Sequence, residues 1–158
     1  MKTLDIRSLT EGVDEYSRAY WYFLPDDHQK NENRCKTRLD VLDCIRHGVP
    51  YDAIEIILDR TSVSRKVLAQ ILHLSVRQMN RYDKNDLLPV EQSGFIYEFS
   101  RLYIRGLDIF GDVETLENWL NRPQLALGNQ VPLELLDTAE GYRLVHDVLA
   151  QIEFGFYA

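Results

Sequence analysis

The chain has few of the features that mark secreted, membrane or metal-binding proteins. Its two cysteines, Cys35 and Cys44, lack the paired spacing of a zinc site; two reduced thiols are predicted, and a bridge between them is the alternative. The longest apolar run, residues 20–24 (YWYFL), is far too short to cross a bilayer. The N-terminal residues 1–12 lack the apolar core of a secretory signal. We therefore expect a cytoplasmic protein without membrane contact.

Catalytic constellations are also lacking, since no serine–histidine pair and no phosphate-binding glycine loop is found. His146 stands beside Asp147 on a predicted helix, where adjacent side chains do not face each other, so it is interpreted as a packed or surface histidine. Glu134, Asp137 and Glu140 are close enough in sequence to suggest a metal, but helix capping accounts for two of them. We expect a protein that is not an enzyme and that uses no metal or cofactor.

The net charge of −7 at pH 7 is distributed unevenly along the chain. Residues 1–59 carry 8 basic and 12 acidic side chains, residues 60–105 carry 8 and 4, and residues 106–158 carry 2 and 9. A basic middle between acidic flanks is typical of a DNA-contacting segment joined to a part with another role.

Apolar residues recur at helical spacing and strand-like alternation is absent, so the fold is predicted to be all-α. One helix is expected between Thr37 and Gly48, and Pro50 is expected to lead the next. A long helix is predicted from about Val90 to Phe110, with Gly111 as its stop and Asp112 as the next N-cap. The residues predicted to face the core are Leu39, Leu42, Ile45, Ala53, Ile54, Ile57, Leu58, Val113, Leu116, Trp119 and Leu120.

Residues 1–36 are the hardest part of the chain to interpret. An aromatic cluster at residues 20–23 (YWYF) is interpreted as a packing anchor rather than a platform on which bases stack. Residues 25–36 form a polar stretch with the composition of a linker. The predicted domains are a partly flexible extension (residues 1–36), a DNA-binding domain (37–89), and a long linking helix with a C-terminal module (90–158).

The stretch SRKVLAQILHLSVRQMNRY, residues 64–82, has the spacing of a helix-turn-helix. Ser64 and Ser75 are predicted N-caps of its two helices, and Ala69 lets these helices approach closely. His73 occupies the turn position that usually carries glycine, and histidine tolerates the positive φ required there. The apolar contacts predicted between the helices are Leu68, Leu72, Leu74, Met79 and Tyr82.

This motif predicts which side chains meet DNA. Exposed residues of the second helix are expected to read bases in the major groove, because Arg suits guanine and Gln or Asn suits adenine; they are Arg77, Gln78, Asn80 and Arg81. Residues placed for phosphates are Arg65, Lys66 and Lys84, and Ser75 completes the predicted DNA-binding set. The alternative is a solvated surface helix, because the same motif also supports protein–protein contacts.

Near the C-terminus, the stretch LGNQVPLELLDTAEG packs several turn and helix signals into residues 127–141. Gly128 and Asn129 predict a turn, and Pro132 predicts the start of a short helix. Asp137 is expected to cap the last helix, with Glu140 completing a capping box. Gly141, in the first turn, predicts the close approach of another segment. The apolar stripe of this helix is predicted to be Tyr142, Val145, Leu149 and Ile152, widened by Leu144 and Val148.

An ordered set of short motifs in the C-terminal half carries a family resemblance. The motifs are FGD at 110–112, WL at 119–120, LG at 127–128, PLELLDT at 132–138, EG at 140–141 and IEFG at 152–155. In this order they resemble the Xre antitoxins of RES–Xre toxin–antitoxin pairs, whose C-terminal module is shared with MbcA and ParS proteins. The resemblance covers about residues 48–158. Asn129 departs from it, since the family usually has a second glycine there, but Asn tolerates the same backbone region.

The resemblance implies an Xre-like helix-turn-helix domain followed by a small helical toxin-binding domain. By this resemblance, the second domain is expected to bind a cognate RES-domain toxin, an enzyme of the ADP-ribosyltransferase-like group that attacks NAD, and to block its active-site cleft. The helix-turn-helix is expected to repress the shared operon by binding operator DNA. A two-fold operator requires a homodimer, for which the helix at about 90–110 and the C-terminal module are candidate surfaces. The alternative is a stand-alone transcriptional regulator without a toxin.

Two sets of residues are expected on the toxin-binding face. An acidic set suits a cleft that binds a dinucleotide phosphate, although the same residues also suit a solvating helix face; it comprises Glu134, Asp137, Glu140, Asp147 and Glu153. The residues expected to bind toxin are Leu127, Gly128, Pro132, Glu134, Leu135, Glu140, Gly141, Glu153, Phe154, Phe156 and Tyr157.

Overall fold

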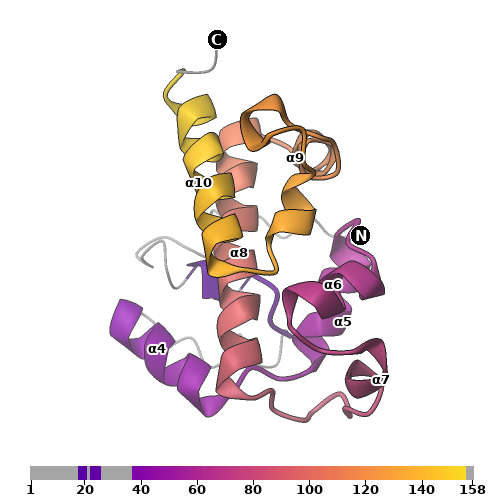
Figure 1. The fold of residues 1–158 in the computed structure, drawn as a ribbon. Helices are drawn as coiled ribbons and strands as arrows, with labels where there is room; N and C mark the ends of the chain where they lie inside the picture. Colours follow the sequence, from indigo (N-terminus) through magenta and orange to yellow (C-terminus); the bar gives the residue numbers. More distant parts are fainter. Residues whose placement is uncertain (1–17, 21, 26–36, 156–158) are drawn as a thin grey trace.

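The computed structural model describes residues 18–20, 22–25 and 37–155 (Figure 1). Within these ranges the chain is helical, and its only β-type pairings are isolated bridges from Pro50 to Leu87 and from Gln124 to Gln130. The predicted all-α fold is confirmed. In chain order the helices are α4 (Arg38–His47), α5 (Asp52–Arg60), α6 (Arg65–Ile71), α7 (Val76–Met79), α8 (Val90–Phe110), α9 (Val113–Leu120), the 3₁₀ helices η1 (Leu125–Leu127) and η2 (Pro132–Leu135), and α10 (Ala139–Glu153).

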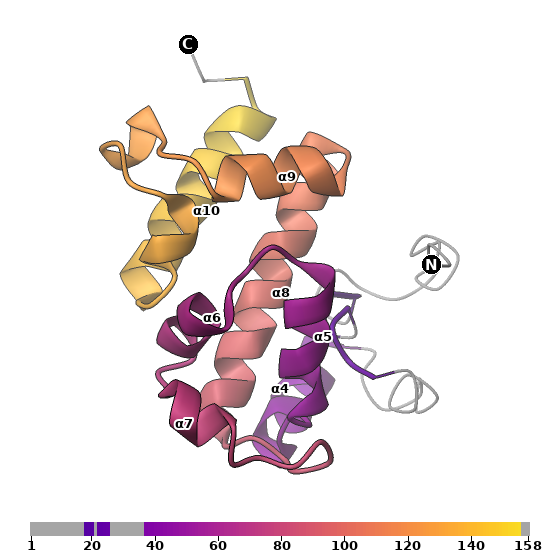
Figure 2. The ribbon, with the colours of Figure 1, turned by 90° about the vertical axis from the view of Figure 1, so that its right-hand side faces the viewer.

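The long helix α8 runs through the middle of the molecule, with α4 to α7 around its first half and α9 and α10 beside its second half (Figure 2). Its bounds match the prediction. Gly111 ends it at φ +86°, and the Asp112 side chain accepts a hydrogen bond from the Thr115 amide to start α9. Ten of its 21 residues are buried, so α8 forms the centre of the hydrophobic core.

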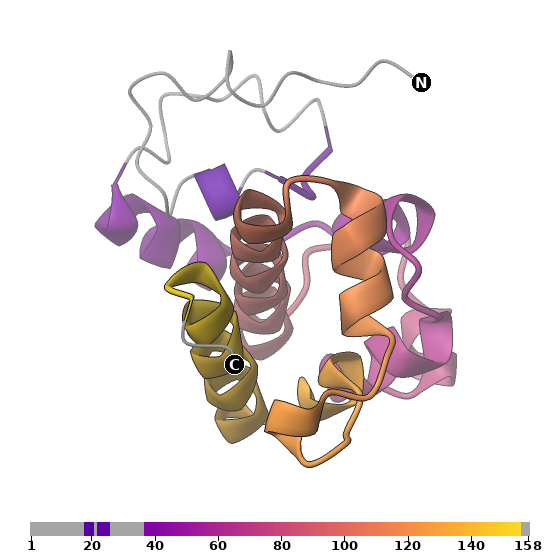
Figure 3. The same ribbon diagram turned by 90° about the horizontal axis from the view of Figure 1, so that it is seen from above.

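Aromatic residues before α4 pack against the middle of α8. The Phe23 side chain is 1% exposed, and its ring centroid lies 5.9 Å from that of Phe99 and 5.4 Å from that of Tyr103. Arg18 donates two hydrogen bonds to the Asp108 carboxylate, at 2.9 and 3.2 Å. Figure 3 shows this short segment beside α8, on the side away from α10.

The packing-anchor interpretation is thereby confirmed for Tyr20 and Phe23, which are buried, and for Tyr22, which packs partly buried against the core. Trp21 lies outside the described residues, as do residues 26–36. At least part of the N-terminal extension therefore belongs to the hydrophobic core.

The predicted inward face of α4 is wrong for two of its three residues. Leu39 is 74% exposed and Leu42 is 41% exposed, whereas Val41 is buried and Ile45 is half-buried. Positions 39 and 41 lie about 200° apart on a helix, so both cannot face the core. The choice between them is made by tertiary packing, because the chain after α4 is held by the Gly48 backbone against Leu87 and Leu88.

Other sequence predictions also need correction. The second helix begins at Asp52 and not at Pro50, because Pro50 pairs with Leu87 in a β-bridge. Val113 and Leu144 are each 46% exposed, although both were expected to face the core. They lie at the margins of their helices' apolar stripes, where the packing partner decides the burial.

The prediction of reduced thiols is wrong for Cys44, which is disulfide-bonded in this structure. The expectation was based on how rarely cytosolic proteins keep disulfides, and that tendency says nothing about which two sulfurs are close in the fold. Cys35 lies outside the described residues. Across the part of the chain that is described, no helix is both long and apolar enough to span a membrane.

Candidate functional sites

The helix-turn-helix is formed by α6, a tight turn and α7. Ser64 caps α6 by accepting from the Val67 amide. Ser75 caps α7 within a full capping box, in which the Ser75 amide donates to the Gln78 side chain at 2.8 Å. His73 takes φ +54°, so the predicted left-handed turn residue is confirmed. Residues buried at the junction are Leu68, Ala69, Leu72 and Met79.

The helix that carries the predicted base-reading residues is short. It ends at Met79, so Asn80 is its C-cap and Arg81 follows in a turn. Their side chains are nevertheless exposed, as are those of Arg77 and Gln78. The Oε1 atom of Gln78 already accepts a hydrogen bond from the Ser75 amide, so its side-chain NH₂ group is the part left to hydrogen-bond a base.

The three side chains predicted to contact phosphates differ in the partners that they already have within the chain. Arg65 donates to both Glu55 oxygens, at 2.9 and 3.0 Å, and to the Tyr51 hydroxyl at 3.3 Å. Lys84 lies 3.8 Å from an Asp52 oxygen but is 73% exposed. Lys66 is exposed on α6. Lys66 and Lys84 are therefore placed for a phosphate, whereas Arg65 first serves to join α5 to α6.

Polar contacts fasten the helix-turn-helix to the rest of the molecule. The Gln92 side chain on α8 donates to the Leu72 carbonyl in the turn, at 3.2 Å. Glu117 on α9 accepts hydrogen bonds from the backbone and hydroxyl of Ser62, just before α6, and from the Tyr103 hydroxyl at 2.7 Å. The pKa of Tyr103 is raised by burial and by this carboxylate. These contacts hold the orientation of α6 and α7 relative to α8.

The start of α10 packs closely on the preceding 3₁₀ helix. A Cβ added to Gly141 would lie 1.6 Å from the Leu135 carbonyl oxygen, so the predicted close approach is confirmed. The N-cap is wrong in the prediction, because Thr138 caps α10 by accepting from the Gly141 amide at 3.0 Å. Asp137 and Thr138 are both good capping residues, and the backbone of the preceding turn decides between them.

The structure divides the predicted toxin-binding residues by burial. Leu127, Pro132 and Gly141 are buried, so they shape the module instead of presenting side chains. The Gly128–Asn129 turn is confirmed, since both residues take positive φ. Phe156 and Tyr157 lie outside the described residues. Leu135 is partly buried against the core, whereas the other predicted positions are exposed, namely Gly128, Glu134, Glu140, Glu153 and Phe154.

The exposed positions next to α10 form two separate groups. Glu134 precedes α10 and Glu140 lies in its first turn, whereas Glu153 and Phe154 lie at its other end. A helix of 15 residues is about 22 Å long, so one small contact cannot cover both groups. Sequence reasoning missed Leu125, which is 82% exposed on η1, because an apolar residue in a short turn carries no periodic signal.

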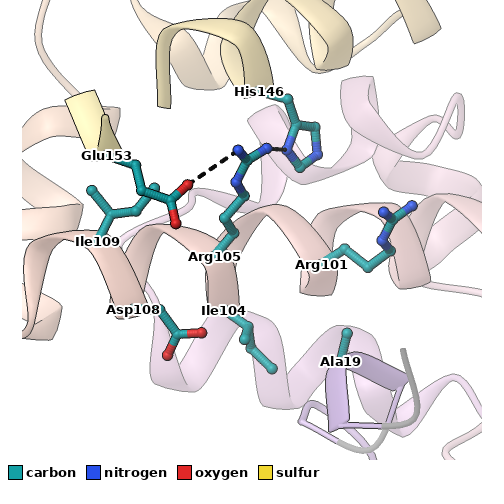
Figure 4. Close-up of a pocket in the computed structure, with 8 residues that line it drawn as sticks. All are labelled: Ala19, Arg101, Ile104, Arg105, Asp108, Ile109, His146 and Glu153. Atoms are coloured by element: carbon teal, nitrogen blue, oxygen red, sulfur yellow. Dashed lines mark hydrogen bonds and ion pairs between the residues drawn. The ribbon is translucent and has the colours of Figure 1, made fainter. Parts of the chain in front are cut away.

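A pocket of about 250 Å³ lies between α8, α10 and Ala19 (Figure 4). Arg105 reaches across it, donating to His146 Nδ1 at 3.2 Å and to a Glu153 oxygen at 3.4 Å. Burial, followed by the charges of Arg105 and Arg101, lowers the pKa of His146 to about 4. The imidazole is thus a neutral acceptor, and the packed-histidine interpretation fits this environment. Among the residues described, no group of His, Cys, Asp and Glu is arranged to hold a metal.

His146 should make the stability of the fold depend on pH. Because its pKa is lowered in the folded chain, stability is complete above the ordinary value of 6.5 and is lost as pH falls towards about 4. The loss should be about 1–2 kcal/mol, less than the full shift implies, because the ring is partly solvated. Urea unfolding of the parent and of His146→Gln at several pH values measures this. The parent should lose more free energy of unfolding than the variant as pH falls, and an equal loss in both would contradict the prediction.

Comparisons with known proteins match both halves of the molecule. Residues 40–101 match the antitoxin Xre-like helix-turn-helix domain, and residues 105–155 match the antitoxin Xre/MbcA/ParS C-terminal toxin-binding domain. The chain is 30% identical over 130 residues to the Prs ADP-ribosylating antitoxin of Sphingobium, covering 76% of this chain and 82% of that protein. It belongs to the Xre/MbcA/ParS antitoxins. It is also 23% identical over 77 residues to antitoxin Xre of Pseudomonas putida, covering 49% of this chain and 48% of that protein.

In this antitoxin the two matched domains meet inside one helix. The helix-turn-helix match ends at residue 101 and the toxin-binding match begins at residue 105, and both positions lie in α8. The first half of α8 therefore packs with the helix-turn-helix and the second half with α9 and α10. The resemblance inferred from the short motifs is confirmed.

Proposed function

We propose that this antitoxin neutralises a cognate RES-domain toxin that degrades NAD, by covering its active-site cleft with the C-terminal module. The support is the toxin-binding domain match over residues 105–155. A blocking role requires only shape and charge complementarity. Exposed apolar side chains such as Leu125 and Phe154 give the module the surface that such contacts use.

The name of the Sphingobium relative favours a second candidate for the toxin. That protein is called a Prs ADP-ribosylating antitoxin, which makes a toxin that transfers ADP-ribose to Prs the alternative partner. The two candidates differ in what happens to NAD. Purified neighbouring gene product should either deplete NAD alone or label a second protein with ADP-ribose, and added antitoxin should suppress whichever activity is present.

We further propose that the antitoxin binds its own operator as a homodimer and represses the operon. The support is that Arg77, Arg81, Lys66 and Lys84 are all exposed, in the basic part of an acidic chain. Two recognition helices related by a two-fold axis would read the two half-sites of a palindrome. A stand-alone regulator would keep this DNA binding but would have no toxin partner.

Replacing Arg77 and Arg81 by alanine should weaken operator binding by at least about 30-fold, because each paired contact to a base contributes about 1–3 kcal/mol. Neutralisation of the toxin should be unchanged, because these arginines lie on the helix-turn-helix. Gel-shift titration and growth of cells that co-express the neighbouring gene measure the two properties. The matched control for DNA binding replaces Arg122 and Arg143, which are exposed on the C-terminal module.

A parent chain that binds its own upstream DNA no better than scrambled DNA contradicts operator recognition. Failure to associate with the neighbouring gene product, or to protect cells from it, contradicts the antitoxin role towards that protein. The two failures are independent, so each half of the proposal is tested separately.

A further inference from the structure

A cleft of about 600 Å³ separates the helix-turn-helix from the toxin-binding module. One wall is the exposed face of α6 and the following turn, with Lys66, Gln70 and His73. The opposite wall carries Glu134 on η2 and Asp137 just before α10. His73 Nε2 lies within hydrogen-bonding distance of the Asp137 carbonyl oxygen, which fixes the two walls relative to each other. Figure 2 shows the start of α10 next to α6.

The two carboxylates on this wall are not neutralised by the chain. Among the described residues no cation lies within ion-pair distance of Glu134 or Asp137, whereas Glu140 pairs with Arg143 at 3.0 Å and Glu153 with Arg105 at 3.4 Å. Both side chains are exposed. They therefore present two negative charges towards the face of α6.

That face is where a DNA backbone is expected. In helix-turn-helix complexes the first helix crosses the sugar-phosphate backbone while the second enters the major groove. A phosphate that reaches Lys66 would also lie near the acidic wall across the cleft. The Debye length is about 8 Å at physiological salt, so charges this close are only partly screened.

We propose that Glu134 and Asp137 lower the affinity of the helix-turn-helix for DNA by repelling the phosphate backbone. This inference rests on the proposed DNA binding. It assigns the acidic residues before α10 a role towards DNA in addition to the contact with toxin expected for Glu134. Because phosphates are the same in every sequence, the repulsion should act on operator and scrambled DNA alike.

The test uses the full chain with Glu134→Gln and Asp137→Asn. These changes remove both charges and keep the Asp137 carbonyl that meets His73. The control, Glu114→Gln with Asp147→Asn, changes the net charge equally at exposed sites on α9 and on the middle of α10. The probes are a duplex with the sequence upstream of the gene and a scrambled duplex, titrated between about 50 and 200 mM salt.

The cleft variant should bind both duplexes about 5- to 20-fold more tightly than the control variant at low salt, and the difference should shrink as salt rises. Equal affinities of the cleft and control variants overturn the inference. A gain in affinity that does not change with salt concentration also overturns it. If the parent chain itself binds neither duplex, the proposed DNA binding fails as well. The titration of the parent chain shows this without any variant. Circular dichroism of each variant checks that the helices are retained.

Discussion

Replacing Gly141 by alanine should lower the free energy of unfolding by about 4 kcal/mol or more, an effect that few single substitutions reach. The added methyl group would lie 1.6 Å from the Leu135 carbonyl oxygen and 2.6 Å from its carbon. Both are backbone atoms, so the clash is relieved only if η2 moves away from α10. Because α10 also covers α8, toxin neutralisation should be lost together with stability.

Two glycines of α8 provide a matched series for this prediction. A Cβ at Gly94 meets no atom within 4 Å, so Gly94→Ala should stabilise the chain by up to about 1 kcal/mol through helix propensity. At Gly106 the nearest atom is Leu116 Cδ1 at 2.4 Å, the end of a flexible side chain, so an intermediate cost is expected. Urea unfolding monitored by circular dichroism measures all three. Unfolding of Gly141→Ala at the parent's midpoint would disprove the argument.

Truncating Phe23 to alanine should cost about 3–5 kcal/mol, as for other fully buried phenylalanines. The ring is 1% exposed and contacts the rings of Phe99 and Tyr103, so its loss leaves a cavity against α8. The result is informative because this residue precedes the helix-turn-helix and lies outside both family matches. Thermal and urea unfolding of the full chain measure the loss.

The control for this truncation is Phe154→Ala, which removes the same side chain from a position that is 67% exposed. Its effect on stability should stay within about 0.5 kcal/mol. Comparable losses from both variants, or none from Phe23→Ala, would show that the N-terminal aromatic cluster does not stabilise the fold.

Local signals in the sequence were enough to predict much of the fold. The caps Ser64, Ser75 and Asp112 use side-chain oxygens on the adjacent turn, and the structure forms all three. The positive φ at His73 and Asn129 follows from motif positions that usually carry glycine, and both residue types tolerate it. These features depend on a few neighbouring residues, so they can be inferred without knowledge of the tertiary structure.

Features decided by distant segments were not predictable in the same way. The exposed face of α4 depends on how Gly48 meets Leu87 and Leu88, some forty residues away in the chain. The toxin-binding positions came from conspicuous motif residues, and several of these, including Pro132 and Gly141, are buried. Residues that define a fold stand out in sequence, whereas exposed apolar residues such as Leu125 do not.

The sharing of α8 limits how this protein can be divided. A truncation placed between the matched domains would cut a continuous helix, and one placed after Asp137 would remove α10 and leave apolar side chains of α8 in water. Neither fragment should therefore report the properties of an isolated domain. By the same reasoning, a chimaera of two related antitoxins should acquire the toxin specificity of one of them only when it contains the whole of α8 from that protein together with its C-terminal module.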